Sequence, residues 1–80
     1  MSVYDEIAAE RSRQTSAWPD DHDAFIYAAV LAEECGEVAR AIHDVRFARG
    51  EVEAVRREAV QVAAVAVQIA ERIDSGRIRW

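Results

Sequence analysis

The sequence lacks the cross-links that usually stabilise a small protein. It contains one cysteine, Cys35, so the chain cannot form an internal disulfide bond. It has no CxxC pair and no Cys/His cluster of the kind that holds a structural zinc ion. Its 80 residues make at most one domain, 1–80, and a core of this size contributes only about 3–5 kcal/mol. Association with other copies is the remaining source of stability, and a hydrophobic fraction of 51% is high enough to support it.

Long apolar runs and a basic amino-terminal segment are also missing. No stretch approaches the roughly 20 apolar residues needed to cross a bilayer. The first ten residues, MSVYDEIAAE, carry acids where a secretory signal would carry basic residues. The sequence therefore predicts a cytoplasmic protein with no membrane partner. A net charge of −5 argues against a nucleic-acid polymer as partner, but it permits a single nucleotide, because a bound divalent cation reverses the local field.

Proline and glycine are scarce, and the few present mark the ends of predicted helices. Ser2, with Asp5 three residues later, forms a weak capping box for a first helix. Pro19 disfavours helix at the residue before it, so we expect a loop over 15–21. No segment alternates with a period of two, so we expect no strand and an all-α fold. The predicted helices span about 2–14, from an aspartate cap at 20, 21 or 23 to about Ala48 with Gly50 as stop signal, and about 51–74 with Ser75-Gly76 as stop signal.

The third predicted helix has the clearest apolar pattern. Between 59 and 70 the apolar residues spread around the helix, interrupted only by Gln61 and Gln68. Such a helix is expected to be buried on nearly every side, which a single three-helix chain cannot achieve. We therefore expect an antiparallel bundle of about three helices, completed as a homodimer or homotetramer. The residues with the 3-4 spacing of a coiled-coil seam are Val52, Val55, Ala59, Val62, Ala66, Ile69 and Ile73.

Carboxylates interrupt the apolar faces of the second and third predicted helices. EECGE places Glu33, Glu34 and Glu37 within about a 100° arc of one helix face, and Glu34 continues the apolar stripe of that helix. Glu58 lies about 40° from the centre of the seam on the third helix, with Gln61 one turn onward. Packing the two apolar stripes together would bring Glu34, Glu37 and Glu58 towards one another at the edge of a core.

A magnesium ion would resolve the repulsion between these groups. Ionised carboxylates at the edge of a core are costly when unpaired. Mg²⁺ takes oxygen ligands in octahedral geometry at about 2.0–2.1 Å and leaves positions open for water and phosphate oxygens. Metal-held phosphates and a carboxylate-activated water suit hydrolysis of a phosphoanhydride. In the competing interpretation the glutamates form a solvated face, or pair with Arg40, Arg56 and Arg57 in a purely structural arrangement.

The motifs also resemble those of a known family. EECGEVARAI followed by REAVQVAAVAV resembles the MazG-like all-alpha nucleoside triphosphate pyrophosphohydrolases, whose signature is EExxE on one helix and ExxD on the next. The interval between Glu37 and Glu58 fits that signature, and the run ERSRQ…W…H resembles the segment upstream of it. The resemblance covers about residues 6–73. EExxE alone is weakly specific, and it gains specificity from the second motif and the helical frame.

The resemblance implies Mg²⁺-dependent hydrolysis of a nucleoside triphosphate to the monophosphate and pyrophosphate, by a dimer or tetramer. Removal of non-standard nucleotides is the role it suggests. Carried over by position, the metal ligands would be Glu33, Glu34, Glu37 and Glu58, with one of them orienting the attacking water, and Gln61 would stand at the last motif position. Gln14 and Trp18 would line the base or sugar. Forked guanidinium groups suit phosphate oxygens, which makes Arg40 and Arg57 candidates for the triphosphate, together with Arg11, Arg13 and Arg56.

Two departures from the family pattern bear on activity. Gln61 stands where the family has aspartate, which removes one negative charge and should weaken metal binding or eliminate one of two metals. The chain also has almost nothing after Asp74 to form a further helix, so another subunit would complete the bundle. The alternatives to an enzyme are therefore a catalytically weak or inactive relative that binds a nucleotide or a protein, and a structural helical assembly.

Overall fold

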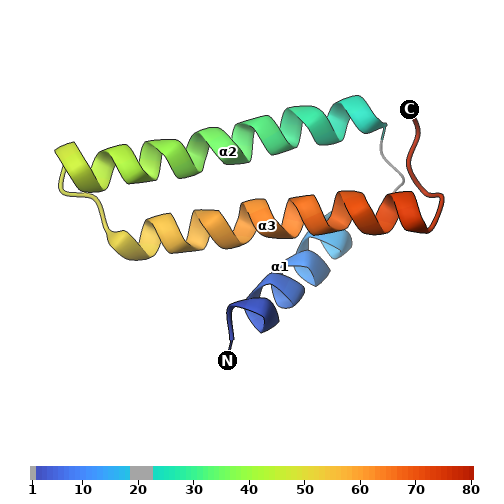
Figure 1. The fold of residues 1–80 in the computed structure, drawn as a ribbon, viewed down its shortest axis with the longest axis horizontal. Helices are drawn as coiled ribbons and strands as arrows, with labels where there is room; N and C mark the ends of the chain where they lie inside the picture. Colours follow the sequence, from blue (N-terminus) through green and yellow to red (C-terminus); the bar gives the residue numbers. More distant parts are fainter. Residues whose placement is uncertain (1, 19–22) are drawn as a thin grey trace.

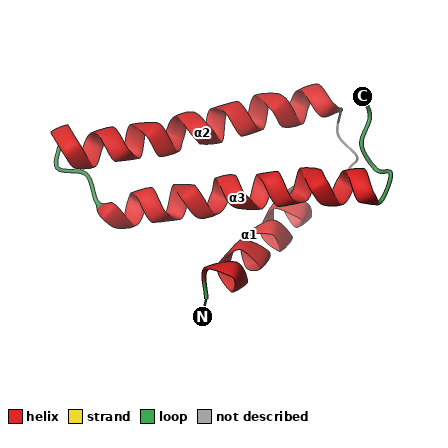
Figure 2. Cartoon of the chain, in the orientation of Figure 1, coloured by secondary structure: helices red, strands yellow, loops and turns green. Residues whose placement is uncertain are grey.

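The computed structural model describes residues 2–18 and 23–80, and these residues are almost entirely helical (Figure 2). Three helices follow one another along the chain: α1 (Val3–Ala17), α2 (Ala24–Phe47) and α3 (Val52–Asp74). Within the described residues there is no strand, only one isolated bridge between Asp23 and Arg79. The all-α class predicted from the sequence is confirmed, and no helix in the described part is long and apolar enough to span a membrane.

Side-chain caps fix where the first two helices begin. The Ser2 side chain accepts a hydrogen bond from the Asp5 backbone N–H, and Asp5 accepts one from the Ser2 backbone, which completes the predicted capping box. Asp23 is the residue that caps α2, and its carboxylate accepts from the Phe25 backbone N–H at 2.7 Å. The candidate caps at 20 and 21 lie outside the described residues.

Helix α1 is longer than the sequence predicted. It continues through Ala17, and the Trp18 backbone N–H donates to the Gln14 carbonyl at 2.8 Å. The prediction of a loop from residue 15 was wrong for residues 15–17. A proline restricts only the residue directly before it, so Pro19 limits Trp18 and leaves the preceding turn free to remain helical.

The turn between α2 and α3 depends on a close backbone approach. Arg49 has a positive φ of 59°, and the Gly50 N–H donates to the Asp44 carbonyl at 2.8 Å. A Cβ atom added at Gly50 would lie 2.8 Å from the Asp44 Cβ. Gly50 therefore ends α2 through its small size, while the left-handed conformation falls on Arg49.

Helix α3 ends in a Schellman motif. Gly76 has a φ of 69°, its N–H donates to the Ile73 carbonyl at 3.1 Å, and the Arg77 N–H donates to the Arg72 carbonyl at 2.8 Å. The chain then returns beside the start of α2, where the Ala24 N–H donates to the Arg79 carbonyl at 2.6 Å. This contact joins the end of the chain to the first turn of α2.

Helix α3 is central to the fold (Figure 1). The longer helix α2 runs antiparallel beside it, and α1 crosses it obliquely. Both α1 and α2 pack against α3, but within the described residues they do not pack against each other. The result is a flat molecule of 43 × 29 × 18 Å, held together by two helix–helix interfaces that share α3.

The core is small and partly polar. Among the described residues, the buried apolar side chains are those of Tyr27, Ala64 and Val65, and the last two lie on α3. The seam predicted on α3 is half covered: Val55, Val62 and Ile69 are partly buried, while the alternate positions are exposed. Burial of α3 on nearly every side is therefore not achieved within one chain, because α1 and α2 reach only part of its surface. Three polar residues are buried as well: Gln14, Gln68 and Arg72.

Candidate metal centre

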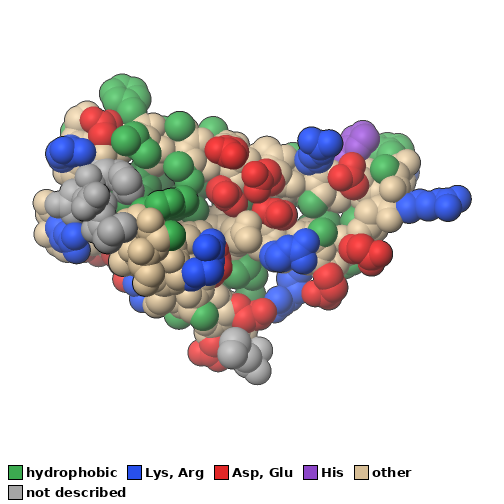
Figure 3. Space-filling model, turned by 180° about the vertical axis from the view of Figure 1, so that it is seen from behind, with side chains coloured by type: hydrophobic (Ala, Val, Ile, Leu, Met, Phe, Trp, Pro, Cys, Tyr) green, Lys and Arg blue, Asp and Glu red, His purple; other side chains and the backbone are tan. Residues whose placement is uncertain are grey.

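The interface between α2 and α3 brings three carboxylates together. Glu34, Glu37 and Glu58 each offer an oxygen atom, and these atoms all lie within 4.8 Å of one another. Acidic side chains gather at the middle of the face shown in Figure 3, seen from the side opposite to Figure 1. The sequence predicted that this trio would meet when the apolar stripes of the two helices pack, and the structure confirms it.

Two of the three carboxylates are partly withdrawn from water. Glu34 and Glu58 are half-buried, whereas Glu37 is exposed. One oxygen of each half-buried carboxylate, Glu34 Oε2 and Glu58 Oε2, is buried and has no hydrogen-bond partner. A buried carboxylate oxygen without a donor is unfavourable, so the arrangement is incomplete without a proton or a cation.

The pKa values of two carboxyl groups of the trio, Glu34 and Glu37, are raised above the ordinary value of a glutamate. Burial raises the pKa of the Glu34 carboxyl, and the neighbouring charges of Glu37 and Glu58 raise it further. A side-chain hydrogen bond with Glu58 raises the pKa of Glu37, with burial and the charge of Glu58 adding to the effect. Both groups therefore hold protons more tightly than ordinary glutamates, because burial and the neighbouring carboxylates outweigh the attraction between Arg13 and Glu34.

The arginines that could have neutralised the trio pair elsewhere or stay apart. Arg56 forms a forked ion pair with Glu6 of α1, with Nη1 donating to Oε1 at 2.7 Å. Neither Arg40 nor Arg57 forms an ion pair with any carboxylate of the described residues. The purely structural interpretation, in which arginines hold the glutamates of the trio, therefore finds no support in these contacts.

A cavity of about 260 Å³ continues from the trio towards the turn between α2 and α3. Glu37 and Glu58 line one end of it, and Asp44 and Glu51 also contribute to its wall. Arg40 is the one basic residue among the lining residues. The predicted phosphate contact at Arg40 is thus placed beside the carboxylates, with open space between them.

Three other predicted site residues lie around the trio. Glu33 is exposed and outside the group of three, although its charge contributes to the raised pKa of Glu34. Gln61 and Arg57 line a different cavity, of about 350 Å³, between α1 and α3. Gln61 and Arg57 are thus found in the wall of the cavity on the α1 side of α3, and not among the residues that line the cavity beside the trio.

Helix α1 adds a fourth acidic residue that the sequence analysis did not select as a ligand. Glu10 has a side chain only 15% exposed, and its charge also raises the pKa of Glu34. Arg13 holds the Glu10 carboxylate with two hydrogen bonds of 2.9 and 2.6 Å, which lower the pKa of Glu10. Glu10 belongs to the upstream ERSRQ run, but no spacing rule could place it near a residue on α2.

Gln14 and Trp18, the predicted nucleoside contacts, lie along α1 beyond Glu10. Gln14 is buried, and its amide donates to Glu10 at 3.3 Å and to the Gln61 carbonyl at 3.4 Å. Trp18 is half-buried and lines a small apolar cavity of about 170 Å³ with Tyr27 and residues on either side of it on α2. That cavity lies about 10 Å along α2 from Glu34, a distance that one nucleotide can span.

The donor set of the trio fits a hard divalent cation. Carboxylate oxygens are the ligands that Mg²⁺ prefers, and two ligands on opposite sides of one ion lie about 4.2 Å apart. Oxygens already within 4.8 Å of one another reach that geometry with small side-chain rotations. Comparison of the chain with protein-family models, curated proteins and solved structures finds no match.

Proposed function

We propose that this protein is a Mg²⁺-dependent nucleoside triphosphate pyrophosphohydrolase of the MazG-like type. The observation that carries the proposal is the convergence of Glu34, Glu37 and Glu58 at the α2–α3 interface, with buried oxygens that have no partner. The EExxE motif and Glu58 are the same residues on which the family resemblance rests. The geometry therefore selects three of the four carboxylates of the motifs, all except Glu33.

Under this proposal, the trio and the residues around it have different roles in the reaction. Glu34, Glu37 and Glu58 would hold the cation, which polarises the phosphates and offsets their charge. Glu33 remains outside the group of three, so its carboxylate is available to orient the attacking water and accept its proton. Arg40, in the adjoining cavity, is placed for a phosphate oxygen, and the apolar cavity at Trp18 suits a base.

Pyrophosphate release from a panel of nucleoside triphosphates, with and without Mg²⁺, tests the proposal. We expect activity only with the metal, and a loss of at least about a hundredfold for Glu58→Gln and Glu34→Gln. Glu53→Gln is the matched control, because Glu53 is an exposed glutamate on the same helix outside the trio. Mg²⁺ should raise the melting temperature of the wild type and of Glu53→Gln, but not of Glu58→Gln. An active Glu58→Gln variant would reject the site.

A nucleotide-binding protein with little or no activity is the second candidate. It is favoured by Gln61, which replaces the family's aspartate and lines the cavity on the α1 side of α3. Under the enzyme proposal, Gln61→Asp adds a carboxylate and should increase turnover. Stabilisation by a triphosphate and Mg²⁺, without pyrophosphate release from either version, would favour the second candidate.

We also propose that the protein acts as a homodimer or homotetramer. The seam positions that one chain leaves exposed recur at seven-residue intervals on α3, which is the spacing of a helix–helix contact. A second copy packed there would cover apolar surface that α1 and α2 do not reach. These positions are Val52, Ala59, Ala66 and Ile73.

A further inference from the structure

Helix α1 is attached to α3 through a mostly polar surface. Among the described residues of α1, only the polar Gln14 is buried, whereas Tyr4 is 79% exposed and Ile7 is half-buried. Burial of apolar surface is the main force that holds packed helices together. Because α1 buries little apolar surface against α3, polar contacts have to supply much of the attachment.

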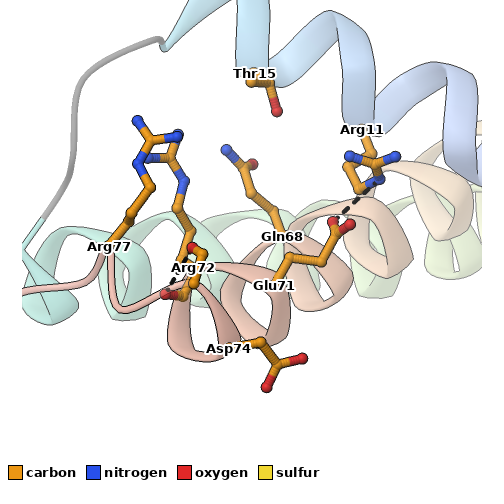
Figure 4. A pocket seen from close by; sticks show the side chains of 8 residues that line it. Arg11, Thr15, Gln68, Glu71, Arg72, Asp74 and Arg77 are labelled. Carbon is orange, nitrogen blue, oxygen red and sulfur yellow. Dashed lines mark hydrogen bonds and ion pairs between the residues drawn. The ribbon is translucent and has the colours of Figure 1, made fainter.

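Two ion pairs join α1 to α3 within the described residues. Near the start of α1, Glu6 accepts two hydrogen bonds from the guanidinium group of Arg56, and one of them is 2.7 Å long. Past the middle of α1, the Nε of Arg11 lies 3.1 Å from the carboxylate of Glu71 (Figure 4). Pairs of an arginine and a carboxylate are among the stronger polar contacts, since both groups are charged. These two pairs form a latch that fastens α1 at two points on α3, which are fifteen residues, or about 22 Å, apart.

Neither ion pair of the latch is shielded from water. The Glu6–Arg56 pair lines a cavity of about 350 Å³ between α1 and α3, and the Arg11–Glu71 pair lines one of about 460 Å³. Their four side chains are between 31% and 49% exposed. Dissolved ions screen charges at such positions, and one surface pair shifts an equilibrium by only about two- to fivefold. The attachment of α1 is therefore expected to weaken as the ionic strength rises.

Buried polar atoms without partners also weaken the attachment. At the α1–α3 interface Gln14 donates to the Gln61 carbonyl at 3.4 Å, but its Oε1 has no partner within the described part of the chain. Gln68 of α3 is 2% exposed and points towards Thr15 of α1 (Figure 4), and neither polar atom of its side chain has a partner among the same residues. A buried polar atom without a hydrogen bond is unfavourable. The closed position of α1 is thus only moderately stable.

We propose that α1 is a lid, held closed on α3 by the two ion pairs of the latch, and that it opens as one unit when dissolved ions weaken these pairs. Because α1 carries Gln14 and is followed directly by Trp18, the closed lid would complete the nucleoside end of the proposed active site. This consequence rests on the proposed function. The lid itself requires neither metal nor nucleotide, so each proposal can fail without the other.

Hydrogen–deuterium exchange of the full chain in EDTA, without metal or nucleotide, tests the lid. Raising the NaCl concentration from about 10 mM to about 1 M shortens the screening length from about 30 Å to about 3 Å. We expect the amides of α1 to exchange about fivefold faster, or more, at the high concentration. Amides in the middle of α3 should keep their rate, because the α2–α3 interface does not depend on the latch.

Two variants on α3 separate the latch from a general effect of salt. Arg56→Gln and Glu71→Gln each remove one ion pair but leave the sequence of α1 unaltered, and each should speed α1 exchange at low salt about two- to fivefold. The double variant should combine both effects and respond little to salt. Asp74→Asn is the matched control, because Asp74 is an exposed carboxylate about one turn from Glu71 whose side chain points away from the neighbouring arginines (Figure 4). It should leave α1 exchange unchanged.

Two results would overturn the proposal. One is α1 exchange that neither salt nor the double variant accelerates, which would show that the ion pairs do not hold the helix. The other is equal acceleration in α1 and in the middle of α3, which would show that the whole fold opens and not α1 alone.

Discussion

At the scale of single residues, the carboxylates of the trio are suited to binding a cation, but they lower the stability of the fold. Glu34 occupies a position on α2 where the apolar stripe would call for a residue such as leucine, and it carries a buried oxygen without a partner. Its neighbours Glu37 and Glu58 add like charge. Such local conflicts between sequence and fold are expected at functional sites.

Replacing Glu34 by glutamine should therefore stabilise the metal-free protein in a pH-dependent way. The folded protein holds the Glu34 proton more tightly than the unfolded chain, whose pKa is near 4.5. As pH rises above 4.5, the unfolded chain ionises first and the wild type loses stability. Glu34→Gln removes this loss, so we expect a gain of about 0.5 kcal/mol, or about 2–4 °C, at pH 7 and almost none at pH 4.

Thermal unfolding in EDTA at pH 4 and pH 7 measures this difference. Glu6 and Glu10 have lowered pKa values because of Arg56 and Arg13, so they act in the opposite direction as pH falls below 4.5. Their contribution is the same in wild type and variant and cancels in the comparison. A Glu34→Gln variant less stable than the wild type at pH 7 would contradict the interpretation.

The trio could be foreseen from the sequence, whereas the remaining polar environment could not. Helical periodicity places Glu34 and Glu58 on apolar stripes, and packing of those stripes is enough to bring them together. The nearness of Glu10 and the burial of Gln68 depend on the angle at which α1 crosses α3. No local spacing encodes that angle, because it arises from contacts between residues about fifty positions apart.

At the scale of elements, the ends of the helices follow local rules and the glycines have different functions. The caps at Ser2 and Asp23 and the stop at Gly76 were predictable because each acts through its immediate neighbours. Gly50 was predicted as a stop, but its mechanism is a close contact with Asp44 rather than a left-handed turn. Gly36 in the middle of α2 has no neighbour within 4 Å of a Cβ atom built on it.

Alanine at these two glycines should shift stability in opposite directions. Gly36→Ala should stabilise the protein by about 0.5–1 kcal/mol, because alanine favours the helix and meets open space. Gly50→Ala should destabilise it by about 1–3 kcal/mol, because its Cβ would lie 2.8 Å from the Asp44 Cβ. Urea denaturation measures both. A destabilising Gly36→Ala would show that a surface from outside the single chain approaches α2 there.

At the scale of the whole molecule, one chain leaves more apolar surface exposed than its small core can offset. Val52 is 68% exposed, and Phe47 and Ile42 are exposed nearby. Val52 and Ile42 line an apolar depression together with Val45. The apolar residues that the sequence places around α3 are thus only partly buried within one copy of the chain.

Size-exclusion chromatography with light scattering should therefore give a mass that is a multiple of 9.0 kDa. Ala66→Glu places a charge in the middle of the exposed seam and should shift the protein towards the monomer. Ala9→Glu adds the same charge to an exposed position of α1 and should leave the mass unchanged. A wild-type mass of 9.0 kDa at concentrations of about 100 µM would contradict association. A protein that stays monomeric at this concentration has a dimer Kd well above the micromolar range.

Within residues 2–18 and 23–80, α1 packs against α3 alone, which makes α1 the helix that can detach first. An isolated helix of its length is marginal in water, and the α2–α3 hairpin retains its own interface when α1 leaves. Amide hydrogens of α1 should consequently exchange with deuterium well before those in the middle of α3. Each opening would take Glu10 away from Glu34 and would expose the buried side chains of Gln14 and Gln68 to water, so the charge around the carboxylate trio would change whenever α1 detaches.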